Sequence, residues 1–405
     1  MQRMSNPRIA ITGMGLVSAI GWTPAEVWGA IERADSGLGP LRLFSSVRGA
    51  SVPVGEVKGD IVARSPLSQG SRTDHLAAYA AQYALEDARL DNILSKERRT
   101  SGIVLGVCTG GMRDSEVFLA DVVQSRPLDF AKLRYHECAS SVNLISEFLG
   151  LGGYQATVST ACTSGAVAIA TARDVLESGE AHIMLAGGVD SLTRLTLNGF
   201  LSLLIVAPDG CRPFDAERAG MSLGEGSGVL VLETEDHARA RGAKIHAFLA
   251  GTGNTCDAYH PTAPAPDGEG MGRAMTRALN GASLRCDQIQ YINAHGTGTI
   301  DNDVNEARAI LNVFGPNPPQ VSSTKRFFGH TLAAAGAIEA IVSIMALERQ
   351  RVPANLGLRR VDPGIGLTPV METVDAELSA VMSNSMGFGG SNCALVFTHA
   401  GSNGK

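Results

Sequence analysis

The chain has 405 residues, enough for one large α/β unit or for two related halves. Its apolar content of 44% and its 47 glycines are ordinary for a globular enzyme with many tight loops. A net charge of −6, without a stripe of basic and aromatic residues, argues against a nucleic-acid partner.

The seven cysteines stand singly, at positions 108, 138, 162, 211, 256, 286 and 393. Without a CxxC pair and with an odd count, we expect neither a metal site nor a disulfide framework. The N-terminal residues lack a signal-peptide pattern, and the apolar stretch 333–347 is interrupted by Glu339 and too short for a bilayer. We therefore expect a cytoplasmic protein with no membrane span.

Short apolar runs alternate with helical patterns along the whole chain. We expect strands at 9–12, 102–107, 156–159, 182–186, 228–233, 244–251, 289–293, 320–323, 380–384 and 393–398. We expect helices at 74–88, 164–178, 270–279, 305–314 and 333–349. This alternation predicts an α/β fold with mostly parallel central strands.

The strands form two successive sets that indicate two halves, 1–243 and 244–405, with no flexible linker between them. Gly13 and Gly15 after the first strand begin a dinucleotide-binding pattern, but Ser18 occupies the place of its third glycine. We therefore expect no nucleotide site.

Cys162 lies at a predicted strand-to-helix junction. Residues 158–160 end a strand, and the small apolar residues 164–170 begin a helix. The sulfur would face the unpaired amide groups and the positive dipole of the helix start. A thiol attacks as its thiolate and has a pKa of about 8.5 when free, so this position favours a nucleophile. A core cysteine at a tight turn is the alternative.

Two histidines also follow predicted strand ends. His295 opens a loop of glycines and threonines that includes Thr297 and Thr299, and His330 follows Gly329 before an alanine-rich helix. Each alone is equally compatible with a structural role. Together with Cys162 they indicate a catalytic site suited to thioesters, because catalytic groups favour loops at strand ends.

Carboxylates and one lysine accompany the histidines. Asp303 and Glu306 follow His295, while Lys325 and Glu339 flank His330 in the sequence. They form either a surface ion-pair network or a buried set that orients the imidazoles, with Lys325 paired to a carboxylate.

The loop 384–392 is expected to be flexible and has Phe388 at its centre. Such a loop allows the Phe388 ring to swing, or it presents a backbone amide that donates a hydrogen bond to an oxyanion.

These segments, in this order, resemble the β-ketoacyl-[acyl-carrier-protein] synthases, the elongating condensing enzymes, over nearly the whole chain. The motifs are Thr12-Gly13-Met14-Gly15, Thr160-Ala161-Cys162, Ala186-Gly187-Gly188, Arg212-Pro213-Phe214-Asp215, Leu223-Gly224-Glu225-Gly226, Asp257-Ala258-Tyr259-His260, 293–299, Ser323-Thr324-Lys325, Gly329-His330 and Gly387-Phe388-Gly389-Gly390. The resemblance implies a thiolase-like fold of five layers, α-β-α-β-α, built from two similar halves. It also implies a homodimer, or a heterodimer with a related subunit, that works with an acyl carrier protein. No bound cofactor is implied, because phosphopantetheine arrives on the carrier.

The resemblance assigns Cys162 the acyl chain as a thioester. It assigns His295 and His330 the decarboxylation of malonyl-carrier and the stabilisation of the enolate through Nε2. The amides of Cys162 and Phe388 would hold the oxyanion, and Lys325 with Glu306 would maintain the histidine geometry.

For substrate binding, the resemblance implies that Phe388 is a gating residue and that Phe200 lines the acyl pocket. Thr297, Thr299 and Thr262 would bind phosphopantetheine, and Arg72 would contact the carrier.

Some positions depart from the family pattern. At Arg326-Phe327 the family usually has threonine or Ser-Met, so Phe327 and Phe328 are expected to reshape the entrance. The Leu203-Leu204 stretch lacks a basic residue that some relatives present to the carrier. Residues 187–197 with 211–213 resemble synthases of specialised pathways, such as aryl polyenes, more than housekeeping enzymes.

Three related protein classes are the alternatives. A thiolase would have a second cysteine in the C-terminal glycine loop, where Phe388 stands, while Cys393 falls in a predicted strand. A non-catalytic chain-length factor would lack the nucleophilic cysteine. An initiating synthase would have asparagine in place of one histidine.

Overall fold

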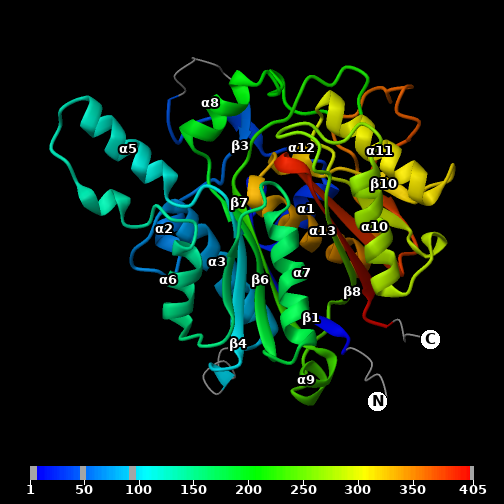
Figure 1. The fold of residues 1–405 in the computed structure, drawn as a ribbon, viewed down its shortest axis with the longest axis horizontal. Coiled ribbons are helices and arrows are strands. Elements are labelled where there is room, and N and C mark those ends of the chain that lie inside the picture. The colour runs from blue at the N-terminus through cyan, green and yellow to red at the C-terminus, as the bar shows by residue number, and fades with distance from the viewer. Residues whose placement is uncertain (1–6, 46–51, 91–96, 402–405) are drawn as a thin grey trace.

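A computed structural model describes residues 7–45, 52–90 and 97–401. Ten strands form one mixed sheet in the order β10-β9-β13-β14-β8-β1-β7-β6-β4-β5 (Figure 1). The strands are β1 (Ile9–Val17), β4 (Ser101–Val107), β5 (Gln155–Val158), β6 (Ile183–Asp190), β7 (Gly226–Thr234), β8 (Ala247–Cys256), β9 (Tyr291–Asn293), β10 (Gln320–Ser322), β13 (Ala380–Gly387) and β14 (Ser391–His399). Two small ribbons, β2 (Leu38–Pro40) with β3 (Pro53–Gly55) and β11 (Arg351–Val352) with β12 (Val374–Asp375), lie outside it.

The sheet repeats one plan twice. The first half runs β5-β4-β6-β7-β1 and the second runs β10-β9-β13-β14-β8, so the chain-order ranks are 3-2-4-5-1 in both. In each half the three outer strands are parallel and the two inner strands join antiparallel. The halves meet where Ile9–Ile11 of β1 pairs with β8. The expectation of two similar halves is therefore confirmed, and the expected boundary after residue 243 falls between α9 (Glu235–Ala240) and β8.

Three helical layers enclose the two half-sheets. Helices α7 (Ser164–Glu177) and α13 (Ala335–Arg349) share one apolar core with both halves of the sheet. Helices α3 (Arg72–Ala88) and α6 (Ser140–Leu149) cover the other face of the first half, and α10 (Glu269–Ala282) and α11 (Ile300–Phe314) cover the other face of the second. Figure 1 shows α7 and α13 in the middle, with α6 and α10 toward opposite sides. This is the expected α-β-α-β-α order.

The central helices pack closely because small residues line their contact. A methyl group on Gly165 of α7 would lie only 2.6 Å from the carbonyl oxygen of Ala333, in the turn that leads into α13. Glycine here brings the start of α7, next to Cys162, against the segment that follows His330.

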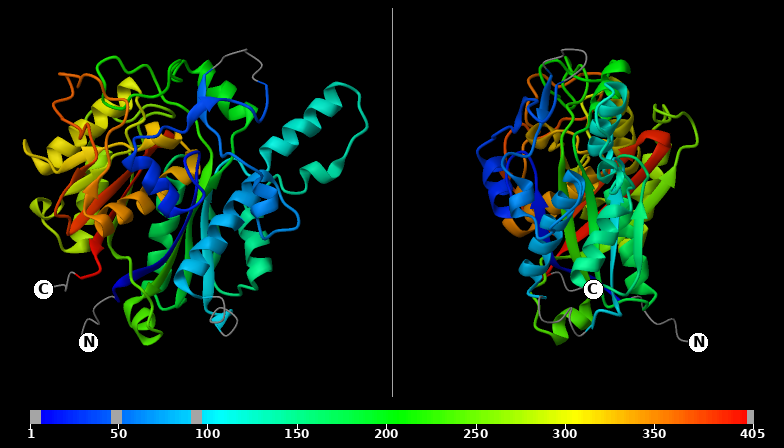
Figure 2. Two further views of the ribbon diagram at one scale, coloured as in Figure 1. Left: turned by 180° about the vertical axis from the view of Figure 1, so that it is seen from behind. Right: turned by 90° about the vertical axis from the view of Figure 1, so that its left-hand side faces the viewer.

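The remaining helices are short or peripheral. They are α1 (Pro24–Glu32), α2 (Ile61–Arg64), α5 (Met112–Val123), α8 (Arg194–Ser202) and α12 (Lys325–Phe328). Short 3₁₀ turns occur at Phe130–Leu133, Cys286–Gln288, Leu332–Ala334 and Phe388–Gly390. Helix α5 and the Phe130–Leu133 turn form an arm that projects from the body (Figure 2).

Two segments differ from the sequence expectations. The loop 384–392, expected to be flexible, is a hairpin whose strands β13 and β14 pair up to Gly387 and Ser391. Gly389 and Gly390, both with φ near 80°, close it in a left-handed conformation that suits glycine. The helix expected at 305–314 begins earlier, at Ile300, with Asp301 and Asp303 favouring its first turn.

Among the described helices, none combines the length and the apolar character that crossing a bilayer requires.

Candidate active site

Cys162 stands in a tight turn between β5 and α7. Ala161, just before it, has a left-handed backbone with φ of 53°. The carbonyl of Ala161 accepts from the Ser164 hydroxyl at 2.6 Å, and this hydroxyl oxygen accepts from the Thr160 amide at 2.9 Å. This bonding fixes the turn and holds the thiol at the start of α7, as the sequence predicts.

The thiol of Cys162 is neutral at physiological pH. Burial raises its pKa to about 11, and this outweighs the opposing effects of Lys325 and of the amides of Phe388 and Cys162. The helix start favours the thiolate, but desolvation is the larger effect. A base must take the proton when the sulfur reacts.

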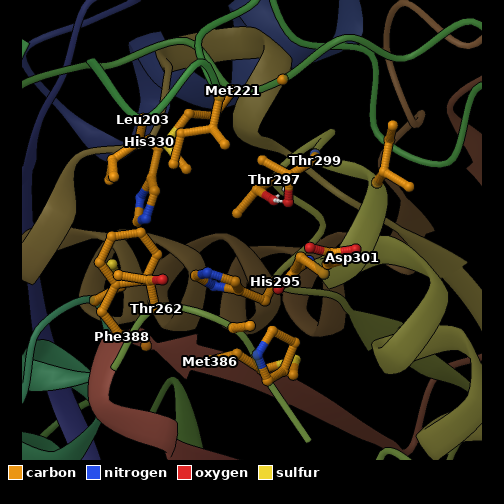
Figure 3. A pocket seen from close by; sticks show the side chains of 18 of the residues that line it. Leu203, Met221, Thr262, His295, Thr297, Thr299, Asp301, His330, Met386 and Phe388 are labelled. Carbon is orange, nitrogen blue, oxygen red and sulfur yellow. Dashed lines mark hydrogen bonds between the residues drawn. The ribbon is translucent and has the colours of Figure 1, made fainter. Parts of the chain in front are cut away.

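His295 and His330 face the same cavity as Cys162. Their ring centroids are 5.2 Å apart and the planes are nearly perpendicular at 86°. Figure 3 shows both rings pointing into the cavity beside Phe388. Burial first, and then the charge of Lys325, lowers the pKa of each ring well below its usual range, so both imidazoles are neutral.

Lys325 determines which nitrogen of His295 carries the proton. Its Nζ lies 3.2 Å from Nδ1 of His295 and 2.5 Å from Oε1 of Glu339, and both lysine and carboxylate are fully buried. An ammonium group can only donate, so Nδ1 accepts and the proton of the neutral ring is on Nε2. Burial raises the pKa of Glu339 to about 7 against the opposing effect of Lys325.

Glu306 supports His295 through the backbone and does not pair with Lys325. Its carboxylate accepts from the amides of His295 at 2.7 Å and Gly296 at 2.8 Å. Burial raises the pKa of Glu306 to about 7. Glu306 therefore fixes the backbone under His295, while Glu339 is the partner of the lysine.

Asp303 fixes the next part of the same loop. Its carboxylate accepts from the amides of Phe214 at 2.7 Å and Gly298 at 3.1 Å, and burial raises its pKa. The hydroxyls of Thr297 and Thr299 lie 2.9 Å apart above this support. Both threonines line the cavity, so the loop offers two hydroxyls to a ligand.

The cavity has a volume of about 380 Å³ and reaches from the surface to Cys162. Thr262 and Phe388 also line it, as expected for residues that bind or gate a substrate. Phe200 does not line it. Its ring packs against Phe388 with centroids 5.6 Å apart, so its connection with this cavity is through that ring.

Other sequence expectations for this region are wrong. Arg72 is not free to contact a carrier, because its guanidinium bonds the buried Glu225 at 2.5 Å and the Val57 carbonyl at 3.2 Å. Phe327 and Phe328 do not shape an entrance but are fully buried in the central core.

Cys393 is packed inside β14, as expected, and burial raises its pKa to about 12.

Asp190 is a site residue that the sequence analysis missed. At the end of β6 it accepts from the amides of Cys108 at 3.1 Å, Thr109 at 2.7 Å and Ala333 at 2.9 Å. Burial raises its pKa to about 6. It ties the end of β4 to the segment that follows His330. The sequence did contain a signal for Asp190, because a carboxylate stands directly at the end of a buried apolar strand.

The chain belongs to the β-ketoacyl synthase family. The family's model for the N-terminal domain of β-ketoacyl synthase matches residues 6–238, and the C-terminal domain model matches residues 246–359. The 3-oxoacyl-[acyl-carrier-protein] synthase 2 of Synechocystis sp. is 36% identical, with 98% of this chain and 99% of that protein covered. The enzyme of the same name from Staphylococcus aureus is 35% identical, with 97% and 98% covered.

Solved structures agree in fold. The ishigamide ketosynthase/chain length factor matches with a TM-score of 0.93 and 33% identity, over 98% of this chain and 100% of that one. A β-ketoacyl synthase from Burkholderia phymatum matches with a TM-score of 0.88 and 32% identity, over 97% and 100%. The thiolase-like fold expected from the sequence is thereby confirmed.

Proposed function

We propose that this protein is a 3-oxoacyl-[acyl-carrier-protein] synthase that extends an acyl chain by decarboxylative condensation. The observation that carries the proposal is the convergence of Cys162, His295 and His330 on one cavity. The neutral rings suit this reaction, because loss of CO₂ creates a carbanion without a strong base and the enolate oxygen then needs hydrogen-bond donors.

In the first step Cys162 attacks the acyl thioester of a carrier. A neutral imidazole accepts the thiol proton and passes it to the departing pantetheine sulfur. Both ring nitrogens of His330 are buried without a hydrogen-bond partner, so this ring is free to do so. The amides of Cys162 and Phe388, which face the sulfur, are the donors for the tetrahedral oxyanion.

In the second step malonyl-carrier enters the emptied cavity. Its carboxylate leaves as CO₂, and the electron pair moves to the thioester oxygen, where Nε2–H groups of His295 and His330 stabilise the enolate. The carbanion attacks the Cys162 thioester, a carbon–carbon bond forms, and the cysteine sulfur leaves and regains a proton. Thr262, Thr297 and Thr299 contact the phosphopantetheine arm, which the carrier brings, so no resident cofactor is required.

Two observations bear on partners. One similar structure is a ketosynthase with its type II polyketide acyl carrier protein, and another is a ketosynthase with its chain length factor. The carrier is the partner that the proposed reaction requires, and either a homodimer or a heterodimer with a related subunit suits this fold. All seven cysteines are free, which supports a cytoplasmic location.

The rival functions lack support. A chain-length factor without chemistry would not need the Cys162 turn, and a thiolase would need a reactive sulfur where Phe388 stands. The pathway, fatty acid or specialised polyene, depends on the acyl chain that the enzyme accepts.

The test uses octanoyl-carrier and malonyl-carrier with the purified protein. The native protein forms an octanoyl adduct on Cys162 and a 3-oxodecanoyl product, and Cys162→Ala forms neither. His330→Ala forms the adduct more slowly, because the acceptor for the thiol proton is lost, and condensation from the adduct falls by a further factor of about 100 to 1000 because one enolate donor is lost. Product formation by Cys162→Ala at the native rate refutes the proposal.

A further inference from the structure

Arg218 is a buried arginine that lies behind the loop of Thr297 and Thr299. It is 8% exposed and does not line the cavity, whereas both threonines do. Its guanidinium group can therefore act on a ligand in the cavity only through this loop.

The guanidinium group of Arg218 joins three segments of the chain. Its Nε donates to the carbonyl of Thr299 and its Nη2 to the carbonyl of Ile300, both at 3.4 Å. Its Nη1 donates to the carbonyl of Asp215 at 3.0 Å and to the carboxylate of Asp362 at 2.6 Å. Because the guanidinium group is planar and rigid, these bonds fix the three segments relative to one another.

Arg218 also acts on the loop through Asp303. Its Nε lies 3.7 Å from Oδ2 of Asp303, and the Asp303 carboxylate accepts from the amide of Gly298 at 3.1 Å. Burial raises the pKa of Asp303, and the charge of Arg218 opposes this effect. Arg218 therefore favours the ionised carboxylate, which is the better acceptor for the Gly298 amide.

These contacts hold the backbone that carries the two hydroxyls. The hydroxyls of Thr297 and Thr299 lie 2.9 Å apart, on either side of Gly298, and Figure 3 shows both threonines at the cavity. The carbonyl of Thr299 already accepts from the amide of Asp303 at 3.3 Å in the first turn of α11. The helix start thus has its own hydrogen bond, and the further bond from Arg218 fixes where the loop lies.

We propose that Arg218 is a positioning residue for the phosphopantetheine arm, because it holds the Thr297–Thr299 loop with both hydroxyls toward the cavity. This inference rests on the proposed function and adds a buried residue that determines how tightly the arm binds. Arg218 itself touches neither the arm nor the reacting atoms.

The first experiment measures acylation of Cys162 by two octanoyl thioesters. One is octanoyl-pantetheine, and the other is S-ethyl thiooctanoate, which has the same thioester but no arm. For Arg218→Gln, the half-saturating concentration of octanoyl-pantetheine rises about tenfold while the maximal rate changes less than about twofold. The rate constant with S-ethyl thiooctanoate stays within about twofold of the native value. Equal losses with both thioesters would overturn the proposal, because they would show general damage to the site.

Two further variants serve as comparisons. Arg218→Lys keeps the charge but lacks the planar fork, so the half-saturating concentration rises only about threefold. Arg360→Gln is the matched control, because the side chain of Arg360 is 70% exposed, pairs with Glu217 at 3.7 Å and does not line the cavity. It leaves both reactions unchanged. An effect of Arg360→Gln as large as that of Arg218→Gln would overturn the proposal.

A double-mutant cycle tests whether Arg218 acts through the hydroxyls. In a chain with Thr297→Val and Thr299→Val, Arg218→Gln raises the half-saturating concentration by less than about twofold further, since the groups it positions are gone. The full tenfold rise in this background refutes the proposal. If Arg218→Gln does not fold, Arg218→Lys takes its place in the cycle, and equal factors in both backgrounds refute the proposal in the same way.

Arm binding without turnover separates this inference from the proposed function. Free phosphopantetheine protects Cys162 from iodoacetamide, and the half-protecting concentration rises about tenfold in Arg218→Gln. An unchanged value refutes the role of Arg218 alone. Protection of the native protein together with no condensation product refutes the proposed synthase reaction and leaves the role of Arg218 in arm binding intact.

Discussion

Two opposing effects act on the ionisation of the Cys162 thiol. The amides of Phe388 and Cys162 and the charge of Lys325 favour the thiolate, while complete desolvation favours the thiol. Desolvation is larger, so the reactive form appears only when a neutral imidazole accepts the proton. This keeps the sulfur protonated, and so less open to oxidation or alkylation, between turnovers.

This balance predicts the pH dependence of Cys162 alkylation. Because the pKa is about 11, the rate with iodoacetamide rises about tenfold per pH unit from about pH 7 to 10. Glutathione, a solution thiol, serves as the control and levels off above about pH 9. The measurement is mass spectrometry of the Cys162 peptide at fixed times. A plateau below pH 9 would contradict the desolvation argument.

At the scale of elements, the site depends on how closely α7 approaches the segment before α13. Gly165 makes this approach possible, because a methyl group there would overlap the carbonyl oxygen of Ala333. This contact joins two parts of the site, because Cys162 directly precedes α7 and His330 directly precedes the turn that contains Ala333. The distance between nucleophile and imidazole is therefore set by helix packing.

We predict that Gly165→Ala lowers the free energy of unfolding by about 1–3 kcal/mol, because the added methyl group overpacks the central layer. Gly199→Ala is the matched control. Gly199 lies within α8, and nothing lies within 4 Å of a methyl group there. Alanine at this position raises stability by up to about 1 kcal/mol through helix propensity. Urea unfolding measures both, and equal effects of the two substitutions would refute the packing argument.

At the scale of the whole molecule, His246 connects the two halves. Its ring lies 3.0 Å from Asp87 at the end of α3 and 2.8 Å from Glu348 at the end of α13, with Lys244 3.2 Å away. Burial lowers the pKa of His246, but Asp87 and Glu348 outweigh this effect and raise it overall. When it is protonated, the ring joins the outer helix of the first half to the central layer.

A raised pKa in the folded state fixes the sign of the pH effect. The contribution of His246 is complete below its unfolded pKa of about 6.5 and is lost as pH rises through the folded value. We predict that His246→Gln costs about 1 kcal/mol at pH 6 and much less at pH 9, measured by urea unfolding. His136→Gln, on the exposed arm, should show no such difference between the two pH values. A cost for His246→Gln that does not depend on pH would rule out the charged contact.

The sequence alone determined the α/β class and the repeated plan, and it singled out the three residues that the structure places around one cavity. Strands alternate with helices in a local pattern, and Cys162, His295 and His330 each follow a strand end, which is a local signal too. Their common place in the fold is not a local property, because β5 and β9 belong to different halves and run in opposite directions. The packing of the start of α7 against the segment that follows His330 brings the two halves of the site together.

Only the tertiary structure decided the partners and the protonation states. Lys325 pairs with Glu339 rather than Glu306, and Arg72 bonds Glu225, because these contacts depend on which helices pack together. The pKa of Cys162 depends on burial by distant segments, which outweighs the helix start visible in the sequence. Desolvation and ion pairing are properties of the assembled surroundings, so no local pattern encodes them.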